Sequence, residues 1–370
     1  MAHLGRHTAA AAAVTLLATA LAGCDAAPTV TPEPTVAAAG AAMDVYVSKL
    51  VEAQGFHGAV LVARGADILL SEGYGLADQS AGVSNTPHTL FRVGSVTKQF
   101  TALAVLKLQE LGKLNVTDRV CRHLTPCPAA WKAVTVEHLL VHTSGIPNFT
   151  SFPDYPTFSA TTLRPEQLVG LFSDRPTEFP PGSRWQYSNS GYALLGYLIE
   201  RVAGVSYAEF LDRQILEPLG LAETGYDVNH PTAEAHAIGY SGGNTPARFI
   251  DMSIPYAAGA LYSSVSDLYR WNRFLLTRAP AIVRAATLAE MFTPRVPIDP
   301  AAPDKVQYGY GWEVSGPGTD VTYSHDGGID GFVSHNLIRP RDQLSITVLS
   351  NLDTVVVAYI AQNLAAIAAR

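Results

Sequence analysis

The last third of the chain contains short apolar segments that are separated by turn residues. Segments of this kind are typical of strands that pair in antiparallel order through short connections. Nearer the N-terminus, Gly58–Gly65 and Ile68–Gly75 show the same pattern and predict a hairpin across residues 65–67. The strands expected in the last third are Tyr308–Val314, Val321–Ser324, Phe332–Arg339 and Leu344–Ser350.

Other segments place apolar residues three or four positions apart, which predicts helices. Thr101–Leu111 is apolar at most positions, so we expect a helix that is buried on nearly all sides and ends at Gly112. Thr135 is a suitable N-cap for a short helix that runs to His142. The other expected helices are Ala41–Gln54, Pro165–Phe172, Gly191–Val202, Ser206–Leu216, Ser266–Leu276 and Asp353–Ala369.

The order of these elements predicts an α/β (α+β) fold in which helices flank an antiparallel sheet. The region from about 110 to 220 is mainly helical and is expected to form a subdomain within one domain, 41–370. The 370 residues are 48% hydrophobic, which is enough for a sizeable core. A net charge of −7, without any Lys- or Arg-rich run, argues against a nucleic-acid partner.

The N-terminal residues are expected to lie outside this domain. Residues 1–23 combine a weakly basic start with an Ala- and Leu-rich run, which predicts a signal peptide. The sequence Leu-Ala-Gly-Cys at 21–24 resembles a lipobox, so Cys24 is expected to carry a lipid that anchors an exported protein to a membrane. An ordinary signal peptide is the alternative. The Pro-, Thr- and Ala-rich segment 24–40 is expected to be a flexible tether on the periplasmic or cell-surface side.

Export also bears on the remaining two cysteines. Cys121 and Cys127 are close in sequence, and disulfides persist outside the cytosol, so a disulfide between them is a candidate. Two free, buried thiols are the alternative.

A serine three residues before a lysine precedes the buried helix. Ser95 and Lys98 share one helical face near the helix N-terminus. Burial and the helix dipole both disfavour the ammonium, so the amine is expected to act as a base toward the hydroxyl. Ser-x-x-Lys also occurs by chance, but only Lys98 among the lysines of this chain has a serine at that spacing.

Two further segments carry candidate site residues. Tyr187 and Asn189 follow a proline-rich loop, where a phenol beside an ammonium is expected to have a lowered pKa and to relay protons. Asn189 could hold a substrate carbonyl, or could only cap the next helix. His325, at the end of an expected strand, could donate to a leaving group or bind substrate. The glycines that follow it, Gly327 and Gly328, allow close approach of a substrate, although a plain turn is the alternative.

Two other patterns are weaker. Ser241 fits Gly-x-Ser-x-Gly, but the residues after it predict a loop rather than the helix that this nucleophile elbow requires. His138 and His142 have the spacing of zinc ligands, yet no third ligand is evident. We expect both histidines to be structural and no metal to be bound.

Taken in order, these segments resemble the serine β-lactamase and penicillin-binding protein superfamily, particularly its class C-like branch. The resemblance covers about 45–365, and Ser-x-x-Lys followed by Tyr-x-Asn is its most specific part. The matching segments are FRVGSVTKQ at 91–99, LLVHTSGIP at 139–147, PGSRWQYSN at 181–189, AGALYSSVSD at 258–267, YGYGW at 308–312 and HDGGIDG at 325–331.

The resemblance implies a role for each residue. Ser95 would be the acylated nucleophile, Lys98 its proton acceptor and Tyr187 a proton relay. Asn189 would orient the substrate amide, and the N–H groups of Ser95 and Gly328 would form the oxyanion hole. No metal or organic cofactor would be needed, and the chain is expected to act as a monomer.

The third motif departs from the family pattern. His325-Asp326-Gly327 stands where β-lactamases usually have Lys-Thr-Gly, whose ammonium helps to bind the carboxylate of the drug. Histidine is neutral over much of the relevant pH range, so strong β-lactamase activity is not expected. The resemblance implies a small-molecule or peptide substrate such as a D-amino-acid peptide derived from peptidoglycan, an ester or a β-lactam. A non-catalytic protein that binds or senses such molecules is the alternative.

Overall fold

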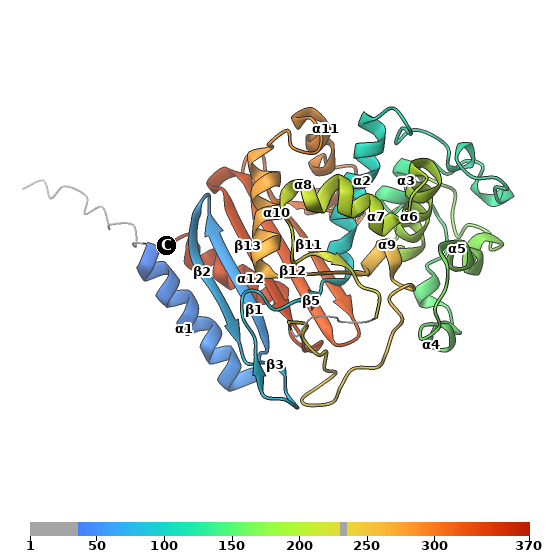
Figure 1. The fold of residues 1–370 in the computed structure, drawn as a ribbon. Coiled ribbons are helices and arrows are strands. Elements are labelled where there is room, and N and C mark those ends of the chain that lie inside the picture. Colours follow the sequence, from blue (N-terminus) through green and yellow to red (C-terminus); the bar gives the residue numbers. More distant parts are fainter. Residues whose placement is uncertain (1–35, 230–234) are drawn as a thin grey trace, which may run out of the picture. The chain divides into compact units, whose positions relative to one another are not determined.

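An antiparallel sheet lies at the centre of the fold (Figure 1). The computed structural model describes residues 36–229 and 235–370, and within these ranges eight strands form the sheet in the order β2-β1-β13-β12-β11-β10-β9-β8. The expected signal peptide, Cys24 and most of the expected tether lie outside the described residues. The strands of this sheet are β1 Gly58–Arg64, β2 Asp67–Tyr74, β8 Val296–Pro297, β9 Val306–Tyr308, β10 Glu313–Ser315, β11 Thr322–Ile329, β12 Phe332–Arg339 and β13 Leu344–Ser350.

The strand β13 pairs with β12 on one side and with β1 on the other. Val348, for example, lies opposite His335 of β12 and opposite Val60 of β1. Both faces of this part of the sheet are covered, so every residue of β13 is buried. The predicted bounds of β12 and β13 are confirmed, and so is the N-terminal hairpin of β1 and β2.

Helices cover the two faces of the sheet. On one face lie α1 (Val36–Gln54) and α12 (Val357–Ala368), whose apolar residues pack with alternate residues of β1 and β13. On the other face, α10 (Val265–Thr277) begins at the N-cap Ser264 and contributes Trp271 to the larger core. The helix α1 already includes residues 36–40, which we had expected to belong to the tether.

A helical region lies beside the sheet, as expected. Between β5 (Phe91–Arg92) and β6 (Gly225–Tyr226), the described chain contains only helices and loops. The helix α2 (Thr97–Glu110) is buried over most of its length, and Gly112 just after it has a left-handed φ of 68°. The helices of this region that follow α2 are α3 Val136–Leu140, α4 Tyr155–Phe158, α5 Pro165–Ser173, α6 Asn189–Ala203, α7 Tyr207–Leu211 and α8 Glu217–Leu219. The remaining elements are β3 Leu76–Asp78, β4 Val83–Ser84, β7 Leu261–Ser263, α9 Tyr256–Gly259 and α11 Ala285–Ala289.

Two strand predictions were wrong in their extent. The segment 308–314 is not one strand but the turn between β9 and β10, because Gly311 has a φ of 74° and lies against the backbone of Lys98. A side chain at Gly311 would place its Cβ 2.7 Å from the Lys98 carbonyl oxygen. The strand β11 continues through Gly328 to Ile329, so the third motif lies within a strand rather than after it.

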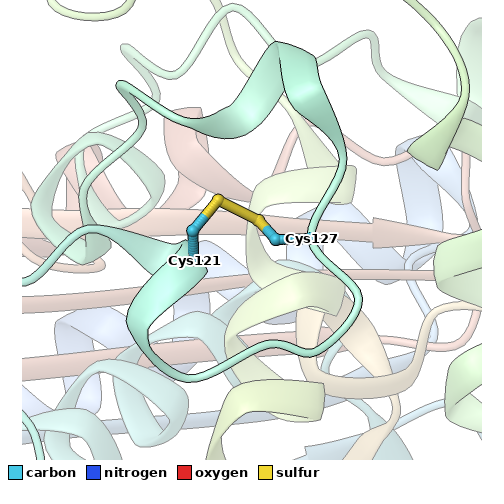
Figure 2. The surroundings of a disulfide bond; sticks show 2 residues. All are labelled: Cys121 and Cys127. Carbon is cyan, nitrogen blue, oxygen red and sulfur yellow. A yellow bond between two sulfur atoms is a disulfide. The ribbon is translucent and has the colours of Figure 1, made fainter.

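Figure 2 shows the disulfide bond between Cys121 and Cys127. It closes a short loop in the helical region, and the candidate pairing is therefore present in the structure. None of the helices in the described ranges is both long and apolar enough to cross a bilayer.

Candidate active site

Ser95 lies in a single turn of 3-10 helix, Gly94–Val96, that leads directly into α2. Gly94 before it has a φ of 50° and lies against β11, where an added Cβ would be 2.8 Å from the backbone nitrogen of Gly328. Only glycine combines this φ with such a close approach. The turn therefore brings the Ser95 hydroxyl beside the glycines of the third motif.

Lys98 is fully buried one turn further along α2. Its Nζ lies 2.9 Å from Ser95 Oγ, 2.9 Å from Asn189 Oδ1 and 2.8 Å from the carbonyl oxygen of Ala258. Burial lowers the pKa of this amine well below its usual value, as expected. Two of its neighbours can only accept, so the two protons of the neutral amine point to them, and its lone pair faces Ser95 Oγ.

Asn189 is the first residue of α6, and its side chain orients Lys98. Asn148 and Thr150 hold it in place, since Asn148 Oδ1 accepts from the Asn189 backbone N–H and Thr150 Oγ1 accepts from Asn189 Nδ2. The alternative that Asn189 only caps the helix is excluded, because Ser188 occupies the N-cap position. The sequence did not predict that the carbonyl oxygen of Ala258 accepts from Lys98, although Ala258 belongs to one of the segments that carry the resemblance.

Tyr187 lies half-buried on the other side of the nucleophile, and its hydroxyl donates to Ser95 Oγ over 2.7 Å. Burial raises the pKa of this phenol, whereas the sequence predicted a lowered pKa. The prediction failed because it considered only a nearby ammonium, whereas removal of the phenol from water dominates its pKa. Tyr187 is consequently a proton donor at neutral pH rather than a phenolate.

His142 supports the loop that carries Tyr187. Its ring lies 4.4 Å from the Tyr187 ring, and its Nδ1 accepts from the backbone N–H of Ser188. His138 instead completes the capping box of α3 with Thr135, the predicted N-cap. Both histidines thus have structural roles, and no group of three metal-ligating side chains occurs in the described ranges.

His325 is buried, and both of its ring nitrogens have partners within the protein. Nδ1 lies 2.6 Å from the Asp326 carbonyl oxygen, which can only accept, so Nδ1 carries the proton. Nε2 then accepts from the Tyr308 hydroxyl at 2.8 Å. Burial lowers the pKa of His325 to about 4. A neutral ring without a free N–H cannot donate to a leaving group, which corrects the role suggested by the sequence.

Two cavities of about 470 Å³ meet at Ser95. The first contains Asn189 and is lined mainly by apolar side chains, including Phe149, Tyr155 and Phe332. The second contains Tyr187 and His325 and runs between β10, β11 and the start of α12. Gly328 lines both cavities, and nothing lies within 4 Å of a Cβ added to it. A substrate that is bound across Ser95 would thus place one half in each cavity.

Ser241 is not part of this site. It lies in an exposed loop, and its hydroxyl donates to Asp353 Oδ2 over 2.6 Å. The strand and helix that would make a nucleophile elbow are absent around it in the described chain. The weak Gly-x-Ser-x-Gly match is therefore unrelated to the catalytic geometry.

The Beta-lactamase family model matches residues 43–369. Protein flp of Staphylococcus aureus (strain MRSA252) is 29% identical over 82% of this chain, which spans 61% of the length of that relative. The octameric penicillin-binding protein homologue from Pyrococcus abyssi is 30% identical with a TM-score of 0.75, over 87% of this chain and 75% of its own. A D-stereospecific amidohydrolase from Streptomyces sp. is 30% identical with a TM-score of 0.71, over 85% of this chain and 94% of its own.

The match covers most of the chain, and the structural relatives share the fold that the sequence predicted. The Ser-x-x-Lys and Tyr-x-Asn segments, which carried the resemblance, meet in one site. The chain therefore belongs to the Beta-lactamase family, within the superfamily of serine β-lactamases and penicillin-binding proteins, and is a serine hydrolase of that family.

Proposed function

We propose that the chain hydrolyses an amide or ester through an acyl-enzyme on Ser95. The observation that carries the proposal is the position of Ser95 Oγ between Lys98 Nζ at 2.9 Å and the Tyr187 hydroxyl at 2.7 Å. One neighbour is an amine with a lowered pKa, and the other is a phenol with a raised pKa. This places a base and an acid on the same oxygen atom, as acylation followed by departure of a leaving group requires.

In the acylation step, Lys98 takes the hydroxyl proton while Ser95 Oγ forms a bond to the carbonyl carbon. The backbone N–H groups of Ser95 and Gly328 stabilise the resulting oxyanion. The carbon–nitrogen or carbon–oxygen bond then breaks, and Tyr187 gives its hydroxyl proton to the leaving atom. Tyr187 in turn receives the proton that Lys98 took from Ser95. Water attacks the acyl-enzyme by the reverse sequence, which releases the acid and restores the Ser95 hydroxyl.

A fluorophosphonate probe tests the identity of the nucleophile. We expect one adduct per chain in the intact mass, and we expect peptide mapping to locate it on Ser95. Ser241→Ala is the matched control and should label like the wild type. An adduct on Ser241, or equal labelling after Ser95→Ala, would contradict the assignment.

Turnover separates a hydrolase from a binding protein of the same fold. The panel consists of a p-nitrophenyl ester, a D-alanyl peptide and a chromogenic cephalosporin, each assayed with wild type and Ser95→Ala. Similarity to the D-stereospecific amidohydrolase supports a D-amino-acid peptide or amide among the substrates. Turnover that depends on Ser95 is expected for at least the ester, whereas stable binding without turnover of any of them would favour the binding protein.

We also propose that the protein is exported and anchored through a lipid on Cys24, which rests on the lipobox-like residues 21–24. In a bacterial host, the wild type should partition into the detergent phase of Triton X-114, and Cys24→Ser should move to the aqueous phase. Equal partitioning of the two would exclude the anchor. The expected monomer stays a prediction, and the homologue from Pyrococcus abyssi is described as octameric.

A further inference from the structure

The second cavity at Ser95 has an unusual balance of charge. Glu313 of β10 and Asp326 of β11 both line it, and no lysine or arginine is among its described lining residues. Three of its valines, Val355 to Val357, come from the start of α12 and the residues before it, and Val333 comes from β12. Burial lowers the pKa of both Lys98 and His325, and therefore disfavours the positively charged form of each.

Glu313 stands out among the carboxylates around the site. Its side chain has no hydrogen bond or ion pair with any residue in the described ranges. In contrast, Asp326 accepts from His335 Nδ1 at 2.6 Å, and Asp330 in the first cavity pairs with Arg248 at 3.1 Å. Burial, followed by the nearby Asp326, raises the pKa of Glu313, and His335, which is hydrogen-bonded to Asp326, partly opposes this shift.

The position of the cavity assigns it to the leaving group. Tyr187, which donates toward the departing atom in the proposed mechanism, lines this cavity and not the first. Asn189, which would orient the substrate amide according to the resemblance, lines only the first. The departing part of the substrate therefore lies next to Glu313.

We propose that Glu313 selects leaving groups that carry a cation, such as an amine or a quaternary ammonium, over leaving groups that carry a carboxylate. The inference rests on the proposed acyl-enzyme function and adds the substrate class to it. An ammonium in this cavity would give Glu313 the partner that the protein does not supply. A carboxylate there would meet two acidic side chains and no fixed cation.

Two thioesters with the same acetyl group test the proposal, because both give the same acyl-enzyme. Acetylthiocholine has a cationic leaving group, and S-acetyl-3-mercaptopropionate has an anionic one. The value of kcat/KM, divided by the rate constant for hydroxide hydrolysis, corrects for intrinsic reactivity. We expect the wild type to favour the cationic thioester by about 10-fold or more at low salt, as a close charge pair allows. The preference should shrink as salt is added.

Glu313→Gln removes the charge and keeps the shape, so it should lower the ratio of the two kcat/KM values by about 10-fold. Glu72→Gln changes the net charge by the same amount on an exposed position of β2 and should leave the ratio unchanged. Thermal melting of each variant confirms that it is folded. The salt dependence of the ratio of the two kcat/KM values in the wild type is a second test of selection by charge, and it needs no variant.

The outcomes distinguish the two levels of the proposal. If Ser95→Ala hydrolyses the thioesters as fast as the wild type, the acyl-enzyme function itself is wrong. If hydrolysis depends on Ser95 but the anionic thioester reacts as fast as the cationic one, the selection by charge is wrong. An unchanged ratio in Glu313→Gln would show that Glu313 is not the residue that selects.

Discussion

Replacing Lys98 by methionine is expected to lower kcat/KM by roughly 1,000-fold, a value typical for loss of a general base. Methionine fills a similar volume but provides no lone pair toward Ser95 Oγ, which Lys98 Nζ approaches to 2.9 Å. Steady-state hydrolysis of a p-nitrophenyl ester measures the effect, and Ser95→Ala gives the background rate without the nucleophile. Lys107→Met on the same helix is the matched control, since Lys107 Nζ donates to the Ile282 carbonyl oxygen far along α2 from Ser95.

The pH profile gives a second test of Lys98. The neutral amine is the active form, and its pKa lies well below the usual value, so kcat/KM should rise with pH and level off above that lowered pKa. The residual activity of Lys98→Met should not show this rise of kcat/KM with pH. His325 has a pKa of about 4 and is neutral well above that pH, so its titration should not change kcat/KM near neutral pH. If Lys98→Met kept the rise of kcat/KM with pH, or more than a tenth of the wild-type activity, Lys98 would not be the base.

Tyr187→Phe should lower kcat for amides by roughly 100-fold, because amide nitrogens need a proton in order to leave. The loss should be much smaller for p-nitrophenyl esters, whose leaving group departs without protonation. The ring contacts with His142 remain in this variant, so the fold should lose only about one hydrogen bond, or roughly 1 kcal/mol.

Tyr192→Phe is the control for this variant. Tyr192 is buried, and its hydroxyl donates to the carbonyl oxygen of Leu140 rather than to Ser95. It should be less stable than the wild type but should show the same ratio of amide to ester rates. Equal losses on amides and esters in Tyr187→Phe would mean that Tyr187 positions the nucleophile and does not transfer a proton.

The strands and the nucleophile were predictable because their signals are local. The strands β12 and β13 are short segments rich in apolar and β-branched residues and are bounded by turn residues, and Ser95 and Lys98 are one helical turn apart. The hairpin at 308–314 was missed because the aromatic residues there read as a strand. The position of Gly311 against the backbone of Lys98, a contact across more than 200 residues of sequence, decides the turn.

The protonation states were less predictable, since they depend on burial. The sequence places Tyr187 near a lysine, but burial in the fold lowers the pKa of Lys98 and raises the pKa of Tyr187. Similarly, His325 loses its role as a donor because Tyr308 and the Asp326 carbonyl occupy its nitrogens. Glu313 had no sequence signal at all, because only the pairing of β10 with β11 brings it toward Ser95.

The place of β13 between β1 and β12 also constrains how the protein folds. The segment Leu344–Ser350 follows every other strand in the described chain, yet it joins the N-terminal hairpin to the rest of the sheet. Val60 must find Val348 across nearly the whole length of the domain, and contacts of such long range slow folding. The sheet therefore cannot close until the C-terminal part of the chain is available, and until then β1 and β12 each expose an unpaired backbone edge that is prone to wrong pairing.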